Sequence, residues 1–169
     1  MRDGGGKSKG SSFERTICVA LSKWLSHDER EDLLWRSSMS GGRATVARKS
    51  GKVLQSQAGD LSAIHPDGHN FTDFFYCELK SYNDLNYQGL LTNSGNLYKF
   101  WQSTITEANS YKKQPMLIAK QNRMPIVVFI QSKSLELLCL HAAQCAIAAP
   151  RHGLYGFLFD DFLKLAKPL

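Results

Sequence analysis

The sequence predicts a mixed α/β fold in which helices flank a mixed central β-sheet. Three observations favour this class: a helical apolar pattern near the start, two strand-like segments around a turn, and a second helical pattern followed by short apolar strands. With 169 residues, of which 43% are apolar, the chain can build one substantial core. We therefore expect a single domain over residues 12–169, preceded by a flexible basic tail over residues 1–11.

The first expected element is a helix over residues 12–25. Ile17 and Leu21 belong to its apolar face, because they recur at helical spacing. Ser11 and Glu14 have the form of a capping box at its start, in which the glutamate side chain reaches back to the backbone of the serine. The role of Glu14 can therefore be purely structural, as the capping residue of this helix.

A second, short helix is expected over residues 26–35. Ser26 and Glu29 again form a capping-box pattern, and apolar residues follow them. Residues 36–43 are polar, contain two glycines, and are typical of a loop that carries two arginines.

Two strands and a turn are expected in the middle of the chain. Residues 60–65 and 74–80 have strand-like patterns, and the sequence Pro-Asp-Gly-His-Asn at residues 66–70 is typical of a turn. We expect the two strands to form an antiparallel hairpin. The polar residues 82–96 then indicate a long loop.

A further helix follows this loop, with Leu97, Trp101 and Ala108 on its apolar face and Pro115 beyond its end. Short strands are expected over residues 116–119, 126–130 and 135–140, and a closing helical turn over residues 162–165.

Composition narrows the class of partner and the compartment. The formal net charge of +6 favours a polyanionic partner, with nucleic acid first. The four cysteines form no Cys-x-x-Cys pair and lie in or beside apolar stretches, which fits a reducing compartment. No apolar stretch is long and uncharged enough for a membrane segment. We expect a location in the cytoplasm of a bacterial, archaeal or phage-infected cell, without a membrane partner.

The residues that carry chemistry lie in the predicted strand over residues 74–80. Alternation along a strand places Glu78 and Lys80 on one face and Cys77 and Leu79 on the other. Asp60, on the preceding strand, could lie close to Glu78 through cross-strand pairing. Alternatively, these charges form an ordinary exposed strand face, with Asp60 as a turn residue.

Clustered carboxylates favour a bound hard cation, and Mg²⁺ typically takes one or two protein carboxylates together with water and phosphate oxygens. Such a cation on Asp60 and Glu78, with Mn²⁺ as a substitute, suits phosphodiester cleavage. Lys80 could orient or deprotonate the attacking water, or stabilise the transition state as a cation. The sequence leaves these roles open.

The motif Gly59-Asp60, then seventeen residues, then Glu78-Leu-Lys80 resembles the signature of the PD-(D/E)xK nuclease superfamily. Gly59 stands in place of the proline, as it does in many members. The resemblance implies a restriction-endonuclease-like core and a metal-dependent nuclease. It also implies that Glu14, on the preceding helix, joins Asp60 and Glu78 at the metal.

Within the superfamily, the order of elements resembles the Holliday junction resolvases of archaea and phages. Gln102 resembles a glutamine that these enzymes carry on the helix after the Glu-x-Lys strand. Their DNA-facing loop suggests phosphate contacts for Arg36, Ser40 and Arg43, and Lys99 is a further candidate. The resemblance implies a homodimer that cuts four-way junctions, or other branched DNA, and leaves 5′-phosphate ends.

Two other functions stay open: a less selective nicking or end-processing DNA nuclease, and a non-catalytic DNA-binding module on the same fold. Tyr82, Tyr87 and Tyr98 could stack on exposed bases, although packing is the simpler interpretation. His65 and His69 have a spacing known from zinc sites, but they span the predicted turn without further ligands.

Overall fold

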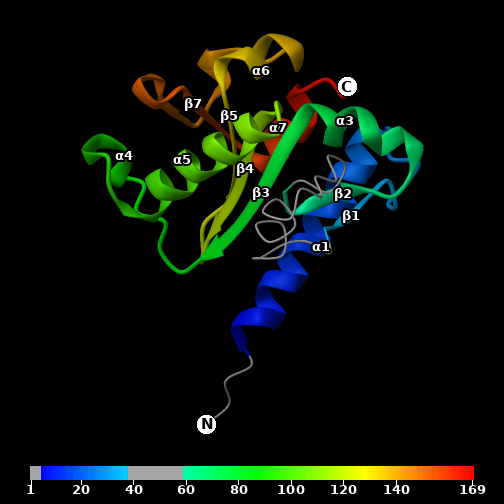
Figure 1. Cartoon of the computed structure of the whole chain (residues 1–169), viewed down its shortest axis with the longest axis horizontal. Coiled ribbons are helices and arrows are strands. Elements are labelled where there is room, and N and C mark those ends of the chain that lie inside the picture. Colours follow the sequence, from blue (N-terminus) through cyan, green and yellow to red (C-terminus); the bar gives the residue numbers. More distant parts are fainter. Residues whose placement is uncertain (1–4, 38–58) are drawn as a thin grey trace. The chain divides into compact units, whose positions relative to one another are not determined.

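The structure is a computed structural model that describes residues 5–37 and 59–169. The chain divides into two compact units, Met1–Asp73 and Phe74–Leu169 (Figure 1). The expected single domain over residues 12–169 stays a prediction.

The first unit opens with helix α1, Gly5–Leu25. Phe13, Ile17 and Leu21 are buried along one face of this helix, as their spacing predicts. The helix begins before the expected start at residue 12 and includes most of the expected tail. A helix, once nucleated, gains one hydrogen bond for each residue it adds, so it can extend through residues without an apolar signal.

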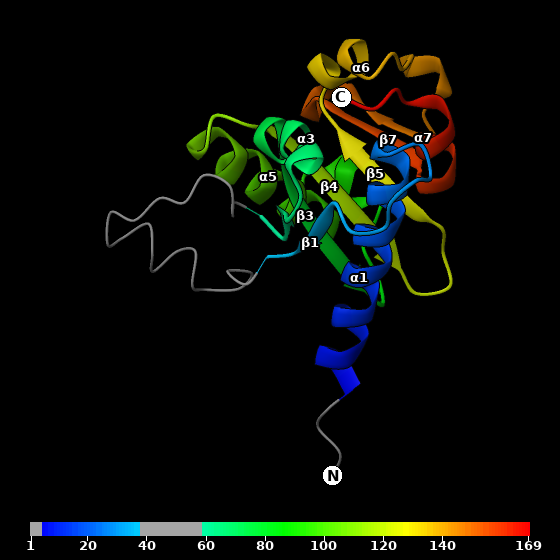
Figure 2. The same ribbon diagram turned by 90° about the vertical axis from the view of Figure 1, so that its right-hand side faces the viewer.

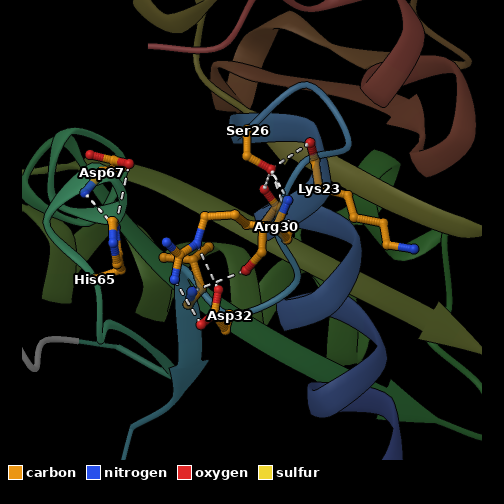
Figure 3. Close-up of polar contacts among 8 residues, drawn as sticks. Lys23, Ser26, Arg30, Asp32, His65 and Asp67 are labelled. Atoms are coloured by element: carbon orange, nitrogen blue, oxygen red, sulfur yellow. Dashed lines mark hydrogen bonds and ion pairs between the residues drawn. The ribbon is translucent and has the colours of Figure 1, made fainter.

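The predicted second helix over residues 26–35 is wrong. His27 and Asp28 have positive φ angles of 53° and 69°, so the chain turns out of the helical path directly after α1. Ser26 fixes this turn: its Oγ donates to the Ser22 carbonyl at 2.8 Å and accepts from the Arg30 backbone N–H at 2.9 Å (Figure 3). Ser26 therefore stabilises the turn that ends α1, whereas the capping-box pattern of Ser26 and Glu29 predicted the start of a second helix.

Strand β1, Leu34–Arg36, follows instead and pairs antiparallel with β2, Leu61–Ala63. Arg30 and Asp32 precede β1 in the chain and form a bidentate ion pair, with N–O distances of 2.8 and 2.9 Å (Figure 3). The partner of β2 is therefore β1, and the expected hairpin between residues 60–65 and 74–80 is wrong.

The turn sequence after β2 starts helices rather than a hairpin. Pro66–Gly68 forms the 3₁₀-helix η2, and α3, His69–Phe74, continues from it. His65 caps η2, because its Nδ1 accepts from the Asp67 backbone N–H at 3.3 Å (Figure 3). Proline at the first helical position fits this start, since its φ angle is already helical and its missing N–H has no helical partner to lose.

The second unit contains a five-stranded sheet in the order β3-β4-β5-β7-β6 (Figure 1). Its strands are β3 (Phe75–Tyr82), β4 (Gln114–Gln121), β5 (Ile126–Ile130), β6 (Ile147–Ala149) and β7 (Leu154–Leu158). The β3–β4 pair is parallel and the other pairs are antiparallel. The mixed sheet confirms the predicted fold class.

Helices pack on this sheet, and consecutive residues of β4 and β5 are buried, so these two strands are covered on both faces. Helix α5, Gly95–Ser110, connects β3 to β4 and packs on both strands. It is preceded by α4, Gly89–Thr92. Trp101 is fully buried in the core that α5 shares with β4 and β5, and it donates from Nε1 to the His152 carbonyl at 2.9 Å.

The C-terminal part adds two helices to this unit. Helix α7, Phe159–Leu165, packs against β5 and β7 and confirms the predicted closing turn (Figure 2). The strand predicted over residues 135–140 is wrong, because α6, Ser132–Leu137, occupies that region. Leu135 and Leu138 are buried while the residues between them are exposed, which is helical rather than strand periodicity. Short 3₁₀-helices, Ala142–Gln144 and Pro150–His152, flank β6.

Candidate active site

Strand β3 carries the predicted pair of charged residues. Phe75, Cys77 and Leu79 are buried, whereas Glu78 and Lys80 are partly exposed. In the parallel pairing with β4, Glu78 lies opposite Leu117 and Lys80 opposite Ala119. Leu117 and Ala119 belong to the core beneath α5, so the charged pair lies on the sheet face that α5 covers.

Both carboxylate oxygens of Glu78 have hydrogen-bond partners on the same strand. Lys80 Nζ donates to Oε1, and the Tyr76 hydroxyl donates to Oε2 at 3.4 Å. The Tyr76 ring is buried and stacks on Tyr111, which follows α5, with the ring centroids 5.9 Å apart. About a fifth of the Glu78 side chain and a quarter of the Lys80 side chain are exposed, so a ligand from solvent can reach the pair.

Lys80 has a second neighbour on α5. Its Nζ lies 5.6 Å from the centroid of the Phe100 ring, within the usual range of a cation–π contact. The ammonium group is thus held between a carboxylate and an aromatic face. This arrangement holds the positively charged ammonium group of Lys80 beside the Glu78 carboxylate.

In the first unit, Glu14 pairs with a residue distant in sequence. Arg36 Nε on β1 donates to Glu14 Oε2 on α1 at 2.5 Å, and both side chains are mostly buried. The capping-box interpretation of Glu14 is wrong, because α1 continues beyond Ser11 and places Glu14 inside the helix. One turn further along α1, burial raises the pKa of the Cys18 thiol to about 12, and the nearby Glu14 carboxylate adds to this effect.

Asp60 lies directly before β2. Its backbone carbonyl accepts from the Ser37 N–H at 2.9 Å, which ties it to the end of β1. Gly59 has a φ angle of 89°, a conformation that glycine adopts without cost and that proline, with φ near −65°, cannot adopt. The backbone therefore explains why glycine stands where the superfamily motif has proline.

The residues predicted for metal binding fall into two groups. Glu14 and Asp60 belong to the first unit, and Glu78 belongs to the second. The hairpin expected to bring Asp60 to Glu78 is absent, because β2 pairs with β1. Across residues 5–37 and 59–169, no cluster of three or more histidine, cysteine, aspartate or glutamate side chains could hold a metal ion.

Two of the remaining predicted site residues, Lys99 and Gln102, lie on α5. Gln102 lies on α5 two positions after Phe100, and residues two apart on a helix do not face each other. The structure therefore does not bring the Gln102 side chain to the side of α5 that carries Phe100. Lys99 is exposed on the same helix, whereas Ser40 and Arg43 lie outside the described residues.

Sequence reasoning did not single out Tyr76 or Phe100 as site residues. The sequence could have identified Tyr76, because the strand alternation that places Glu78 and Lys80 on one face places Tyr76 on the same face. Phe100 could not be identified in this way, since its contact with Lys80 depends on how α5 packs on β3.

Residues 5–149 match the model of a family described as "Phage putative PDDEXK endonuclease". The chain belongs to this family. The matched range contains Asp60, Glu78 and Lys80, and the family description supports the PD-(D/E)xK assignment and a nuclease function. No curated protein and no solved structure matches the chain. In the described part of this family member, no helix has the length and apolar content required to cross a lipid bilayer.

Proposed function

We propose that the protein is a metal-dependent endodeoxyribonuclease whose reaction centre combines Glu78 and Lys80 with Asp60 and Glu14. The observation that carries the proposal is the Glu78–Lys80 pair on β3, inside a match to an endonuclease family. A carboxylate and an amine held on one strand face are the protein groups that the Glu-x-Lys part of the motif requires.

The donor chemistry fits a hard divalent cation such as Mg²⁺, for which Mn²⁺ can substitute. Glu14, Asp60 and Glu78 offer carboxylate oxygens, and each oxygen has two lone pairs. The single hydrogen bond from Tyr76 therefore leaves Glu78 Oε2 able to accept a cation. When bound, the cation would polarise the phosphate and neutralise charge on it.

Lys80 supplies a positive charge that the protein itself positions. Glu78 and the Phe100 ring restrict its ammonium group, so little ordering is needed when a phosphate approaches. In this proposal the ammonium group stabilises the charge that develops on the phosphate oxygens during hydrolysis.

We further propose that the substrate is branched DNA, with the four-way junction first, and that the enzyme acts as a homodimer. The resemblance of the motif and element order to the resolvases supports this, and the net charge of +6 favours a polyanion. A two-fold dimer would place two reaction centres on opposing strands, which symmetric cutting to 5′-phosphate ends requires.

The test is DNA cleavage by the Asp60→Asn variant, which removes one charge and keeps the side-chain shape. We expect cleavage to fall at least about a hundredfold while DNA binding stays within a few-fold of the wild type. Asp161→Asn, at an exposed position on α7, is the matched control and should cut normally. A wild-type protein that is inert with both Mg²⁺ and Mn²⁺ would refute the nuclease proposal.

Substrate choice needs a separate comparison. Rates on a four-way junction and on a linear duplex of the same sequence should differ by at least about tenfold in favour of the junction, equivalent to about 1.4 kcal/mol. Equal rates would exclude the resolvase function but leave the nuclease function intact. Binding should weaken steeply with salt, because phosphate contacts release counterions.

A further inference from the structure

An aromatic pair lies beside Lys80 on the same face of β3. Tyr82 follows Lys80 by two positions, so strand alternation places both side chains on one face. The Tyr82 ring lies on Phe100, with centroids 4.9 Å apart and planes at 51°. Phe100 thus contacts the ammonium group of Lys80 and the ring of Tyr82 at the same time.

The two aromatic pairs on β3 differ in exposure. Tyr76, in its stack on Tyr111, is 8% exposed and belongs to the core. Tyr82 is 45% exposed, although it also contacts another ring. Because Tyr82 is much less covered than Tyr76, a ligand from solvent can reach it.

The backbone holds Tyr82 in a defined place. The residue is the last of β3 and pairs with Gln121 of β4. Its carbonyl also accepts from the Asn122 N–H at 2.9 Å. Tyr82 is therefore presented by the sheet itself and needs little ordering when a flat ligand approaches.

We infer that the Tyr82–Phe100 pair is a stacking site for an unpaired nucleobase of the DNA, next to the phosphate that Lys80 contacts. This inference rests on the proposed nuclease function, and among branched substrates it favours those that carry an unpaired base over a fully paired four-way junction. A base in a duplex is already stacked on its neighbours and must be extruded at a cost, whereas an unpaired base has a free face. The site therefore favours DNA with unpaired bases next to the phosphate that is cut.

The test is binding without divalent cation, so that no cleavage occurs. Fluorescence anisotropy is measured with a labelled single-stranded oligonucleotide and with its fully paired duplex. Tyr82→Ala should weaken single-strand binding by roughly 5- to 150-fold, the range expected for loss of one stacked base, with little effect on duplex binding. Tyr82→Phe keeps the ring and should bind like the wild type.

Leu137→Ala is the matched control, because Leu137 is 43% exposed and lies on α6, away from β3 in the chain. It should change neither affinity. A Tyr82→Ala variant that keeps wild-type affinity for the single strand overturns the inference, and so does one that loses both affinities equally. Circular dichroism of each variant shows whether the fold is intact. If Tyr82→Ala unfolds, Tyr82→Leu, which keeps apolar bulk but removes the flat ring, should show the same selective loss of single-strand binding, and wild-type affinity in Tyr82→Leu would overturn the inference.

The two proposals fail in different ways. Cleavage by the wild type together with no effect of Tyr82→Ala removes the stacking site and leaves the nuclease. A selective loss of single-strand binding in Tyr82→Ala, with no cleavage under any metal, removes the nuclease and leaves a binding site for unpaired bases.

Discussion

Replacing Tyr76 by phenylalanine tests whether its hydroxyl positions Glu78. The change removes one hydrogen bond, from the Tyr76 hydroxyl to Glu78 Oε2, and keeps the ring that stacks on Tyr111. Hydrogen bonds to charged groups contribute about 1.5–3 kcal/mol, but this one spans 3.4 Å, longer than the usual O–H···O⁻ distance. We therefore expect a loss near 1 kcal/mol, equivalent to roughly a fivefold change in metal affinity.

The assay is DNA cleavage as a function of Mg²⁺ concentration. In Tyr76→Phe the half-saturating concentration should rise about fivefold, while the rate at saturating Mg²⁺ stays near wild type. This is less than the roughly 10- to 100-fold typical of residues that support metal ligands, because the hydrogen bond is long. Tyr155→Phe, on β7, is the matched control and should leave the curve unchanged. An unchanged half-saturating concentration in Tyr76→Phe would contradict a positioning role, and a lower melting temperature would indicate a packing role instead.

Further predictions concern the first unit. Cys18, whose pKa is raised to about 12 by burial, should react with a thiol reagent at pH 8 far more slowly than the exposed Cys139, and equal rates in the folded protein would contradict the burial. Because the unfolded thiol ionises near pH 9.0, the free energy of unfolding should fall as pH rises from 9.0 toward 12, less so in Cys18→Ala. Gly68→Ala should lower stability by about 1–3 kcal/mol in thermal unfolding, since the new Cβ would lie 2.7 Å from the Leu33 carbonyl oxygen. Gly10→Ala, within α1 and with no atom within 4 Å of the new Cβ, should instead be neutral or stabilising.

The second unit was the more predictable one, because its signals are local. The alternation that buries Cys77 and Leu79 is a period of two, and it defined β3 and the face of Glu78 together. Leu97, Trp101 and Ala108 marked the buried side of α5 in the same way. Both elements are long enough for their periodicity to be unambiguous.

The hairpin failed because a turn sequence does not specify which strands it joins. Pro, Asp and Gly at residues 66–68 suit a 3₁₀ turn as well as a tight hairpin, and the His65 cap favours the former. The actual partner of β2 is β1, in a register that pairs Leu34 with Ala63. Local sequence patterns do not show contacts between residues so far apart, so the turn sequence could not predict the pairing of β1 with β2.

Glu78 and Glu14 show the same limit within the candidate site. Each carboxylate has a cationic partner, and the two partners differ in sequence separation. Lys80 is two residues from Glu78, so strand alternation alone predicts that they meet. Arg36 is 22 residues from Glu14 and reaches it only because β1 packs on α1. A local rule assigned Glu14 to a cap, and the resemblance to the resolvases suggested DNA contacts for Arg36; neither considers how β1 packs on α1. In the folded unit these two side chains neutralise each other, so a cation or phosphate that binds either of them must first compete with the other.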